Sequence, residues 1–549
     1  MRRREFLTHT LRSLLLASIG PTIHSCFRGP DEFRFSQLDN EFNYIQINLY
    51  GGPTRWMLDN FLIPKQGMEF LPTKMVGSHF SSSDGDVSLK TIERFSFQVP
   101  HFWGLKQHNG VEHSELLKNM ITVRGVDINV LGHPLGIIKT VRPNSEHPSI
   151  HGLISDHSKS PLPSVIFGSN PATRSYHANK RGGLIIPLRK ENLITSILSP
   201  FLMSDEKSFF GAGDKRDRIL KEVLNNIDAV KGFDSIYKNE LKSTLRLFVD
   251  DLQPILNEYE ETHARYQDII KRNIYNFEGL DINRLKLPSL KPTHAKEWGR
   301  YKIDHQTYLG GENLEEMLSS AHPGTLSEQF ACTEVLIKRG IVKSFMISTP
   351  NEMGCLLYNC HNKGNFLNSS FNNSKLIKVK DKNCVIQMDS HETGTILTTA
   401  SAFMYFRSLI PCINNLKVEL KNIKLGNNKT LFDKSLIHLS SEFERRPRED
   451  ESGSDHNNHS HTSSFISGSI KKFQMLGNIT VGRGRLGTIG TAAPVTKINR
   501  TIAARDVYRS VCNILKIECP LPRTHSLLKW DGDTIVQGFE ELKNVRGES

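Results

Sequence analysis

Four short segments of the chain concentrate side chains that could bind a metal ion or act on an ester. They are the Gly-Gly-Pro-Thr turn ending at Thr54, Arg124 with His133 further along, Asp389-Ser390-His391, and a late segment with Glu442, Arg445, Asp455 and His456. Carboxylates and imidazoles from separate segments are what a metal-dependent hydrolase uses to hold ions beside an ester. Thr54 could present a hydroxyl group at the start of a helix. We therefore examine these segments as one site.

Each segment also has a purely structural interpretation. Asp389 and His391 could form a solvated pair in a loop, and Glu442 could simply pair with Arg445. The polar loop over 448–464, which contains His456, could bind nothing, although loops of that length in compact domains tend to be functional or disordered. Taken singly, none of these signals identifies a site.

The order of the segments resembles that of the domain-of-unknown-function 1501 family, which consists of twin-arginine-exported proteins related to sulfatases and alkaline phosphatases. That family shows Gly-Gly-Pro-Ser, an Arg strand with a downstream His, Asp-Thr-His, Ser-Glu-Phe-Gly-Arg-Thr-Pro and Gly-Arg-Asp-His. This chain has Gly51-Gly52-Pro53-Thr54, Arg124-Gly125 with His133, Asp389-Ser390-His391, Ser441-Glu442-Phe443-Glu444-Arg445-Arg446-Pro447 and Gly453-Ser454-Asp455-His456. The resemblance covers roughly residues 44–520. It implies a three-layer α/β core with a mainly parallel sheet.

The resemblance also implies roles for individual residues. Asp389, His391, Glu442, Asp455 and His456 would hold a divalent metal ion, about one per chain. Thr54 would be the nucleophile in the cleavage of phosphate or sulfate esters, with His133 as a further catalytic residue. Arg124 or Arg445 would stabilise the negative charge of the substrate.

Several departures from the family pattern bear on activity. Arg55-Trp56-Met57 stand where the family has His-x-Asp, although Asp59 is nearby, and the strand before Gly51 offers only Asn48 where active relatives carry Asp. Phe443 stands in place of an imidazole found in sulfatases. We therefore expect weak or absent hydrolysis. The alternative is a catalytically silent binding or assembly protein that keeps the fold but has lost part of the metal site.

The surrounding sequence predicts the elements that would position these segments. Short apolar runs predict buried strands at 44–50, 120–126, 165–167, 344–348, 385–388 and 436–439, with helices at 328–338 and 398–409. Strands alternating with helices favour a mainly parallel sheet covered on both faces. In open sheets of this class, ligands bind beyond the carboxyl ends of the strands. All four segments lie at or after predicted strand ends.

The chain divides into six predicted parts. Residues 1–26, with Arg3-Arg4 before a short apolar stretch, resemble a twin-arginine signal, which would make the export machinery a partner and the periplasm or cell surface the destination. Cys26 is a candidate for lipid attachment. We expect a tether over 27–43, the two parts of the core over 44–204 and 301–520, a helical insertion over 205–300, and an extension over 521–549.

Composition restricts the class of protein. Of 549 residues 38% are hydrophobic, enough for a sizeable core, and the formal net charge of +12 permits an anionic substrate or ligand. No dense basic stripe with interleaved aromatics points to nucleic acid, and no apolar run is long enough to span a bilayer. The Gly-x-Gly-x-x-Gly match at 482–487 does not open a βαβ unit, so it predicts no nucleotide site.

Overall fold

The computed structural model describes a large part of the chain. It covers residues 42–55, 58–60, 91–130, 132–158, 160, 162–168, 175–180, 182–188, 192–202, 252–274, 324–349, 352–356, 383–387, 395–447, 454–477, 479–481, 489–495, 498–522 and 524–538. The predicted export signal with Cys26, nearly all of the predicted tether, and Asp389-Ser390-His391 lie outside these residues.

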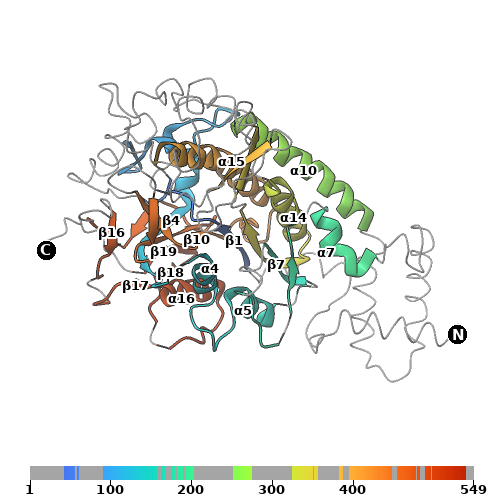
Figure 1. Ribbon diagram of the computed structural model, residues 1–549. Helices are drawn as coiled ribbons and strands as arrows, with labels where there is room; N and C mark the ends of the chain where they lie inside the picture. Colours follow the sequence, from blue (N-terminus) through green and yellow to red (C-terminus); the bar gives the residue numbers. More distant parts are fainter. Residues whose placement is uncertain are drawn as a thin grey trace, which may run out of the picture.

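A nine-stranded sheet forms the centre of the described structure (Figure 1). Its strands run in the order β14-β4-β13-β10-β1-β7-β5-β6, and β17 also pairs with β4. Their bounds are β14 (Gln474–Leu476), β4 (Met120–Asp127), β13 (His461–Ile466), β10 (Ser435–Ser441), β1 (Asn43–Leu49), β7 (Val342–Ser348), β5 (Leu162–Phe167), β6 (Leu184–Ile186) and β17 (Ile502–Ala503). Strand β13 is antiparallel to both of its neighbours, and the other pairings are parallel. The predicted mainly parallel sheet is therefore confirmed.

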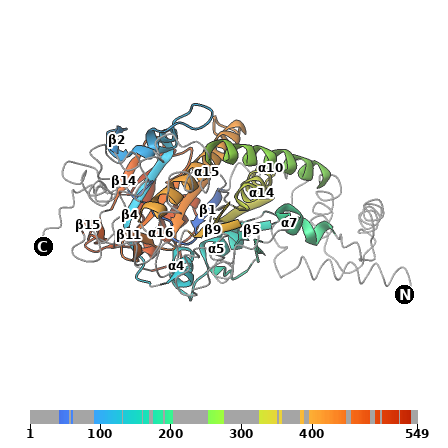
Figure 2. The same cartoon turned by 45° about the horizontal axis from the view of Figure 1, so that its top comes forward.

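Helices cover both faces of this sheet, which gives three layers (Figure 2). One face carries α7 (Leu193–Leu202), α10 (Leu252–Ile274), α14 (Leu326–Lys338) and α15 (Thr395–Asn422). The other carries α4 (His133–Val141), α5 (Ile150–His157) and α16 (Ala504–Leu515). Two separate apolar clusters fill the space between the sheet and these layers. Among the described helices, none is long and apolar enough to cross a membrane.

Strand β1 shows how the sequence produces the two faces. Side chains alternate across a strand, so Ile45, Ile47 and Leu49 pack against the layer of α10, α14 and α15. Tyr44 faces the layer of α4, α5 and α16. Gln46 and Asn48 follow it on the same face by the period of two, and both are fully buried. One face of β1 is thus apolar, and the other carries polar groups inside the protein.

Smaller elements surround this core. They are β2 (Thr91–Arg94) with β3 (Phe97–Pro100), the 3-10 helices η1 (His101–Gly104) and η2 (His113–Asn119), β8 (Glu352–Leu356) with β9 (Asn383–Gln387), β11 (Glu444–Pro447) with β12 (Ser454–Asn457), β15 (Ile479–Val481) with β16 (Ile489–Ala492), and β18 (Leu528–Asp531) with β19 (Thr534–Gln537).

The strand predicted at 385–388 occupies a place that differs from the expectation. It forms as β9, but β9 pairs antiparallel with β8 in a separate two-stranded sheet and not with the central sheet. An apolar run indicates a strand but carries no information about its partner, which explains the error. The prediction that Asp389 and His391 follow a strand of the parallel sheet is therefore wrong on this point.

The block predicted as a helical insertion contributes to the core. Its described part is α10, which packs against α14 and α15 and places Ile255, Tyr259 and Tyr266 in the same apolar cluster as the sheet. The predicted boundary at 520 likewise marks no break in packing, because Leu528 and Ile535 of the β18–β19 hairpin belong to the second cluster.

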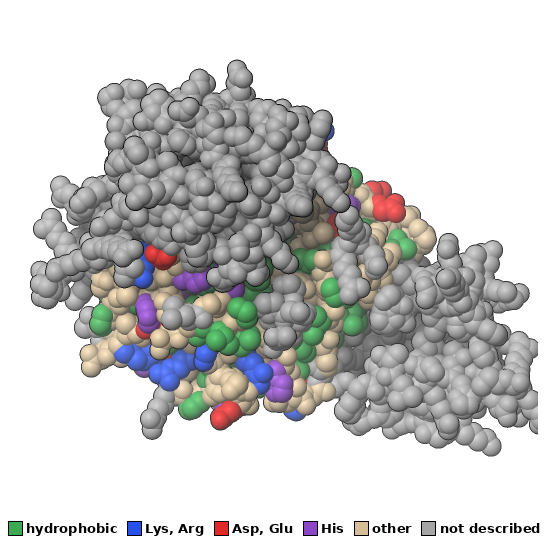
Figure 3. Space-filling model, viewed as in Figure 1, with side chains coloured by type: hydrophobic (Ala, Val, Ile, Leu, Met, Phe, Trp, Pro, Cys, Tyr) green, Lys and Arg blue, Asp and Glu red, His purple; other side chains and the backbone are tan. Residues whose placement is uncertain are grey.

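The surface seen in Figure 3 carries part of the excess positive charge. A row of Lys and Arg side chains runs along the lower part of the described surface, over the layer that contains α4, α5 and α16. Arg505 of α16 and Lys516, which follows this helix, are exposed, which agrees with this picture. Anionic molecules would be attracted to this face at low ionic strength.

Candidate functional site

The carboxyl ends of β1 and β10 meet the start of α4 at one edge of the sheet. Glu442 follows β10 directly, is fully buried, and its Oε1 lies 2.5 Å from Nδ1 of His133, the first residue of α4. The His133 side chain is 21% exposed, so the pair connects the interior with the surface. Gly136 of α4 allows this approach, because a Cβ there would collide with the carbonyl oxygen of Glu442. The helix therefore needs glycine at that position to bring His133 to Glu442.

His456 joins this pair through aromatic contacts. Its ring stacks on Phe443 at a centroid distance of 3.7 Å and meets His133 edge-on at 4.8 Å. The β11–β12 hairpin sets this position, since it pairs Arg445 with His456 and Arg446 with Asp455. Two predicted metal ligands, Glu442 and His456, thus lie around the same imidazole, while Asp455 lies opposite Arg446.

Arg445 holds the loop at 51–54 against this cluster. Its Nε donates to the carbonyl oxygen of Gly52 at 2.7 Å and its Nη2 donates to that of Gly51 at 2.8 Å. Gly52 has a φ of +58°, and a Cβ there would collide with the Phe443 ring. Arg445 is fully buried and positions this loop, and its role as an oxyanion clamp stays a prediction.

Asn48 and Thr54, which flank this loop, carry buried polar atoms with no hydrogen-bond partner in the part of the chain that the structure describes. Both amide atoms of Asn48 and the hydroxyl of Thr54 are in this state, and both residues are fully buried. A buried polar atom left unsatisfied costs about 1–3 kcal/mol, so such atoms point to a bound molecule or to water. Thr54 lies in an irregular loop, so the expected helix start at this residue is not found.

Arg124 is part of the framework of the sheet. Only 1% of it is exposed, and its Nε donates to the carbonyl oxygen of Gly477 at 2.9 Å, where β14 ends. Burial lowers the pKa of the guanidinium to about 10. Arg124 thus makes a structural contact between β4 and the chain after β14, and its role in binding substrate anions stays a prediction.

A second group of charged residues lies on the opposite face of the sheet at the same edge. Arg55 forms a two-pronged ion pair with Asp59 at 2.8 and 2.5 Å, and its Nη1 lies 3.3 Å from Glu444. Nη1 also donates to Ser441 and to the Thr462 carbonyl oxygen. Burial alone would lower the pKa of Arg55, but Asp59 and Glu444 raise it. Burial also raises the pKa of Glu444 to about 8. The Arg55 guanidinium thus faces two carboxyl groups, and its contact with Asp59 is closer than its contact with Glu444.

A belt of hydrogen bonds crosses the sheet beneath α5 and leads to the site. His151 of α5 contacts Ser344 through Nδ1 at 2.5 Å and Gln46 through Nε2 at 2.9 Å, and Gln46 donates to Ser440 at 3.0 Å. The amide oxygen of Gln46 requires that Nε2 carries the proton, so Nδ1 accepts from the Ser344 hydroxyl. Burial lowers the pKa of His151 to about 3. Asn48 lies two residues beyond Gln46 on the same face, at the edge, and is not bonded to this belt.

The predicted metal set is only partly within the described residues. There, no three His, Cys, Asp or Glu side chains are arranged to hold a metal ion. Glu442, Asp455 and His456 lie close in the fold without forming such a group, and Asp389 and His391 are outside the part that the structure describes. The described residues do not by themselves fit an ion.

Fold and site together define an α/β protein with a mainly parallel sheet and a polar cluster beyond the carboxyl ends of its central strands. Comparison with protein-family models, curated proteins and solved structures finds no match for this chain. The resemblance to the domain-of-unknown-function 1501 family therefore stays a prediction.

The sequence patterns missed two features of this edge. The pairing of Glu442 with His133 joins residues 309 positions apart, and nothing local predicts it. The Arg55–Asp59 pair has the spacing of an ion pair one helical turn apart, just after the helix start expected at Thr54, so the sequence contained a signal for this pair.

Proposed function

We propose that the carboxyl edge of the sheet is a hydrolytic site for phosphate or sulfate esters. The observation that carries this proposal is the presence of buried, unpartnered polar atoms on Asn48 and Thr54, beside the buried Glu442–His133 pair. Ligand sites of α/β sheets lie at this edge. The unpartnered atoms are the ones that a bound ester would engage.

In this proposal each residue of the site has a separate role. Glu442 accepts a hydrogen bond from Nδ1 of His133, so proton transfer to or from a substrate would go through Nε2. A carboxylate that orients an imidazole in this way is the usual support for a general base. Thr54 supplies the hydroxyl that attacks or positions the ester, and Asn48 offers an amide to its oxygen atoms. A divalent ion, about one per chain, would require Asp389 and His391 in addition to His456.

A second candidate function is supported by a specific observation. Asn48 is an amide at the strand end where active relatives of the resembling family carry a carboxylate, and Phe443 stacks on one face of His456. Both features favour a protein that binds an ester or anion without cleaving it. In this alternative the same unpartnered atoms bind the ligand.

The decisive experiment measures turnover of 4-nitrophenyl phosphate and 4-nitrophenyl sulfate by the purified protein, with and without added divalent metal ions. Loss of the carboxylate that orients a general base lowers the rate by about 10⁴-fold, so Glu442→Gln, which leaves His133 without its orienting carboxylate, should reduce turnover by about that factor. Thr54→Val should abolish turnover if its hydroxyl is the nucleophile. The matched controls Glu146→Gln, an exposed carboxylate, and Thr195→Val of α7 should leave turnover unchanged.

The metal part is measured separately by elemental analysis of the purified protein. About one ion per chain is expected, and His456→Ala should lower both occupancy and melting temperature, because an ion that binds only the native state stabilises it. Absence of turnover, with binding of the 4-nitrophenyl esters that weakens in Thr54→Val, would establish the binding protein. If the protein shows no turnover of these esters and does not bind them, both proposed functions are contradicted.

A further inference from the structure

A second concavity lies at the opposite edge of the sheet. It has a volume of about 490 Å³ and is lined by residues of the β2–β3 hairpin, η2, β14 and the end of β19. Lys118 precedes β4, and Lys472 and Phe473 precede β14, so the pocket lies at the amino ends of these parallel strands. The Glu442–His133 pair is at the carboxyl end of β10. The two sites are therefore separate, and the volume is within the ~300–1,000 Å³ of pockets that hold small organic ligands.

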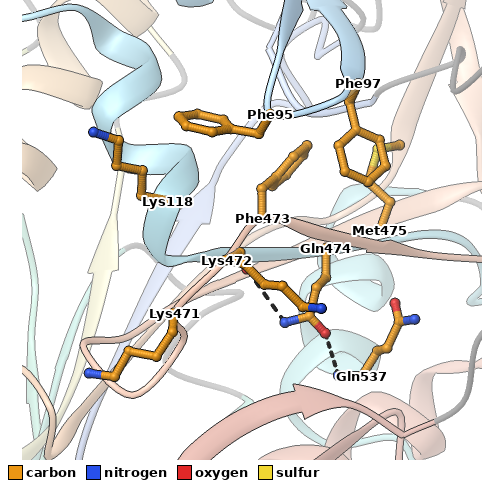
Figure 4. Close-up of a pocket in the computed structure, with 9 residues that line it drawn as sticks. All are labelled: Phe95, Phe97, Lys118, Lys471, Lys472, Phe473, Gln474, Met475 and Gln537. Atoms are coloured by element: carbon orange, nitrogen blue, oxygen red, sulfur yellow. Dashed lines mark hydrogen bonds between the residues drawn. The ribbon is translucent and has the colours of Figure 1, made fainter.

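Aromatic rings form one side of this pocket. Figure 4 shows Phe95, Phe97 and Phe473 gathered together, and the rings of Phe97 and Phe473 meet edge-on at a centroid distance of 4.9 Å. Phe473 and Met475 are buried, whereas Phe95 is 40% exposed. The pocket thus offers a fixed apolar wall with one open ring at its margin.

Phe95 stands in an unfavourable backbone conformation. It has a φ of +52° and the next residue, Ser96, has a φ of +66°, which together form a tight turn that favours Asn or Gly. A bulky side chain in this region is rare and costs free energy, and such strain tends to persist where function requires it. The turn places an exposed aromatic ring at the margin of the pocket, where neither Asn nor Gly would supply one.

The charged residues of the lining are all basic. Lys118, Lys471 and Lys472 belong to it, and no acidic residue does. Lys118 is paired with Glu115 at 2.7 Å and Lys471 with Asp433 at 3.1 Å, while Lys472 forms no ion pair with another described residue. Figure 4 shows Lys118 and Lys471 on the side away from Phe97. An anion bound here would balance the charge of Lys472, because Lys118 and Lys471 already have acidic partners.

We propose that this pocket binds a small organic anion whose flat apolar body packs against Phe95, Phe97 and Phe473 while its carboxylate, sulfate or phosphate group faces the lysines. Aromatic stacking and the positive charge of an exposed lysine favour this combination of body and charge. Gln537 adds an amide at the rim, next to Gln474, which is held by the backbone NH of Gln537. The proposal is independent of the hydrolytic site.

The test is a fluorescence titration of the full-length protein with 1-anilinonaphthalene-8-sulfonate, followed by displacement. Phe95→Ala should weaken binding about tenfold, as expected for the loss of a stacked ring. Lys472→Gln should weaken it about threefold, as expected for a solvent-accessible charge pair. Naphthalene-2-sulfonate should displace the probe, and 2-naphthalenemethanol, which lacks the charge, should displace it much less. Ile185→Ala on β6 and Lys180→Gln are matched controls, because neither residue lines the pocket, and both variants should leave the affinity for the probe unchanged.

The variant Phe95→Asn separates a loss of ligand binding from a loss of folding. Asn accepts a positive φ more readily than Phe, so this variant should raise the melting temperature while it weakens binding of the probe. Equal displacement by the charged and neutral naphthalenes, or unchanged affinity in both Phe95→Ala and Lys472→Gln, would overturn the proposal.

Discussion

Two groups of buried polar residues lie at the same edge of the sheet, one on each face, and they differ in how completely they are satisfied. Around Arg55, the guanidinium is bonded to Asp59, Ser441 and the Thr462 carbonyl oxygen. On the other face, both amide atoms of Asn48 and the hydroxyl of Thr54 have no partner. We call the first the closed group and the second the open group.

The difference separates a structural role from a ligand-binding role. A buried charge is tolerated only when it is paired and hydrogen-bonded, and the Arg55–Asp59 pair of the closed group meets this requirement internally, although Oε2 of Glu444 has no hydrogen-bond partner among the described residues. The open group leaves polar atoms that no other described residue satisfies. Natural proteins accept such a cost at functional sites, where the binding of a ligand offsets it.

The largest expected effect comes from breaking the closed group. Arg55→Met leaves Asp59 and Glu444 buried without their cation, and the loss of one partner of a buried pair costs about 3–5 kcal/mol. Urea denaturation measures this loss. The half-exposed pair of Arg339 with Glu258 is the control, and Arg339→Met should cost no more than about 1 kcal/mol. Equal costs for the two variants would contradict the assignment of Arg55 to the core.

The hydrogen-bonded belt contains neutral side chains, and its buried histidine should make the free energy of unfolding sensitive to acid. His438 of β10 is also buried beside this belt, and its Nδ1 lies 2.8 Å from the Tyr44 hydroxyl. Burial lowers the pKa of His151 and that of His438 to about 3, from an ordinary value of 6.5. Below pH 6.5 the unfolded chain binds protons that the native imidazoles do not, so stability is retained above pH 6.5 and lost as the pH falls toward 3. Each histidine should contribute about 1.4 kcal/mol per pH unit within this window.

Denaturation at several pH values measures this slope, and His151→Gln should reduce it by the share of one group. His147→Gln, a half-exposed histidine after α4, serves as the control and should leave the slope nearly unchanged. A slope that is the same in His151→Gln and in the unaltered protein would show that His151 titrates normally in the native state.

Two substitutions two residues apart on β1 sharpen the comparison. Gln46→Leu removes the partner of the buried His151 and Ser440 groups, so it should cost about 1–3 kcal/mol. Asn48→Leu removes an amide that has no partner, so its effect on stability should be near zero or a gain of up to about 1 kcal/mol. Thermal and urea unfolding measure both. A large loss for Asn48→Leu would indicate a partner that belongs to the protein itself.

The smallest expected effect is that of Thr54→Val on stability. The side chains have the same shape and the hydroxyl has no partner, so the change should lie within about 0.5 kcal/mol of zero. Thr122→Val is the matched control, because the Thr122 hydroxyl is bonded to Ser464 at 3.1 Å, and its loss should cost about 1 kcal/mol. If Thr54→Val is the more costly of the two, Thr54 belongs to the framework and not to the open group.

The sequence by itself determined the local elements of this protein. Alternating and continuous apolar runs predicted β1, β4, β5, β7 and β10, and helical spacing predicted α14 and α15, because hydrophobic periodicity is a property of neighbouring residues. The alternation of strands with helices also predicted a mainly parallel sheet. The sequence also predicted that Glu442 and Thr54 follow the ends of strands. In the structure Glu442 directly follows β10, and Thr54 lies in the loop after β1.

Only the tertiary structure decided which of these residues meet. It brought His133 to Glu442, turned Arg445 and Arg124 toward backbone carbonyl oxygens, and paired β9 with β8 outside the central sheet. These contacts join residues far apart in the chain, and they depend on helix packing and sheet register, which no local pattern encodes. The type and spacing of a charged residue indicate which roles are chemically open to it. The neighbours that tertiary packing places around it determine whether it stabilises the fold or faces a ligand.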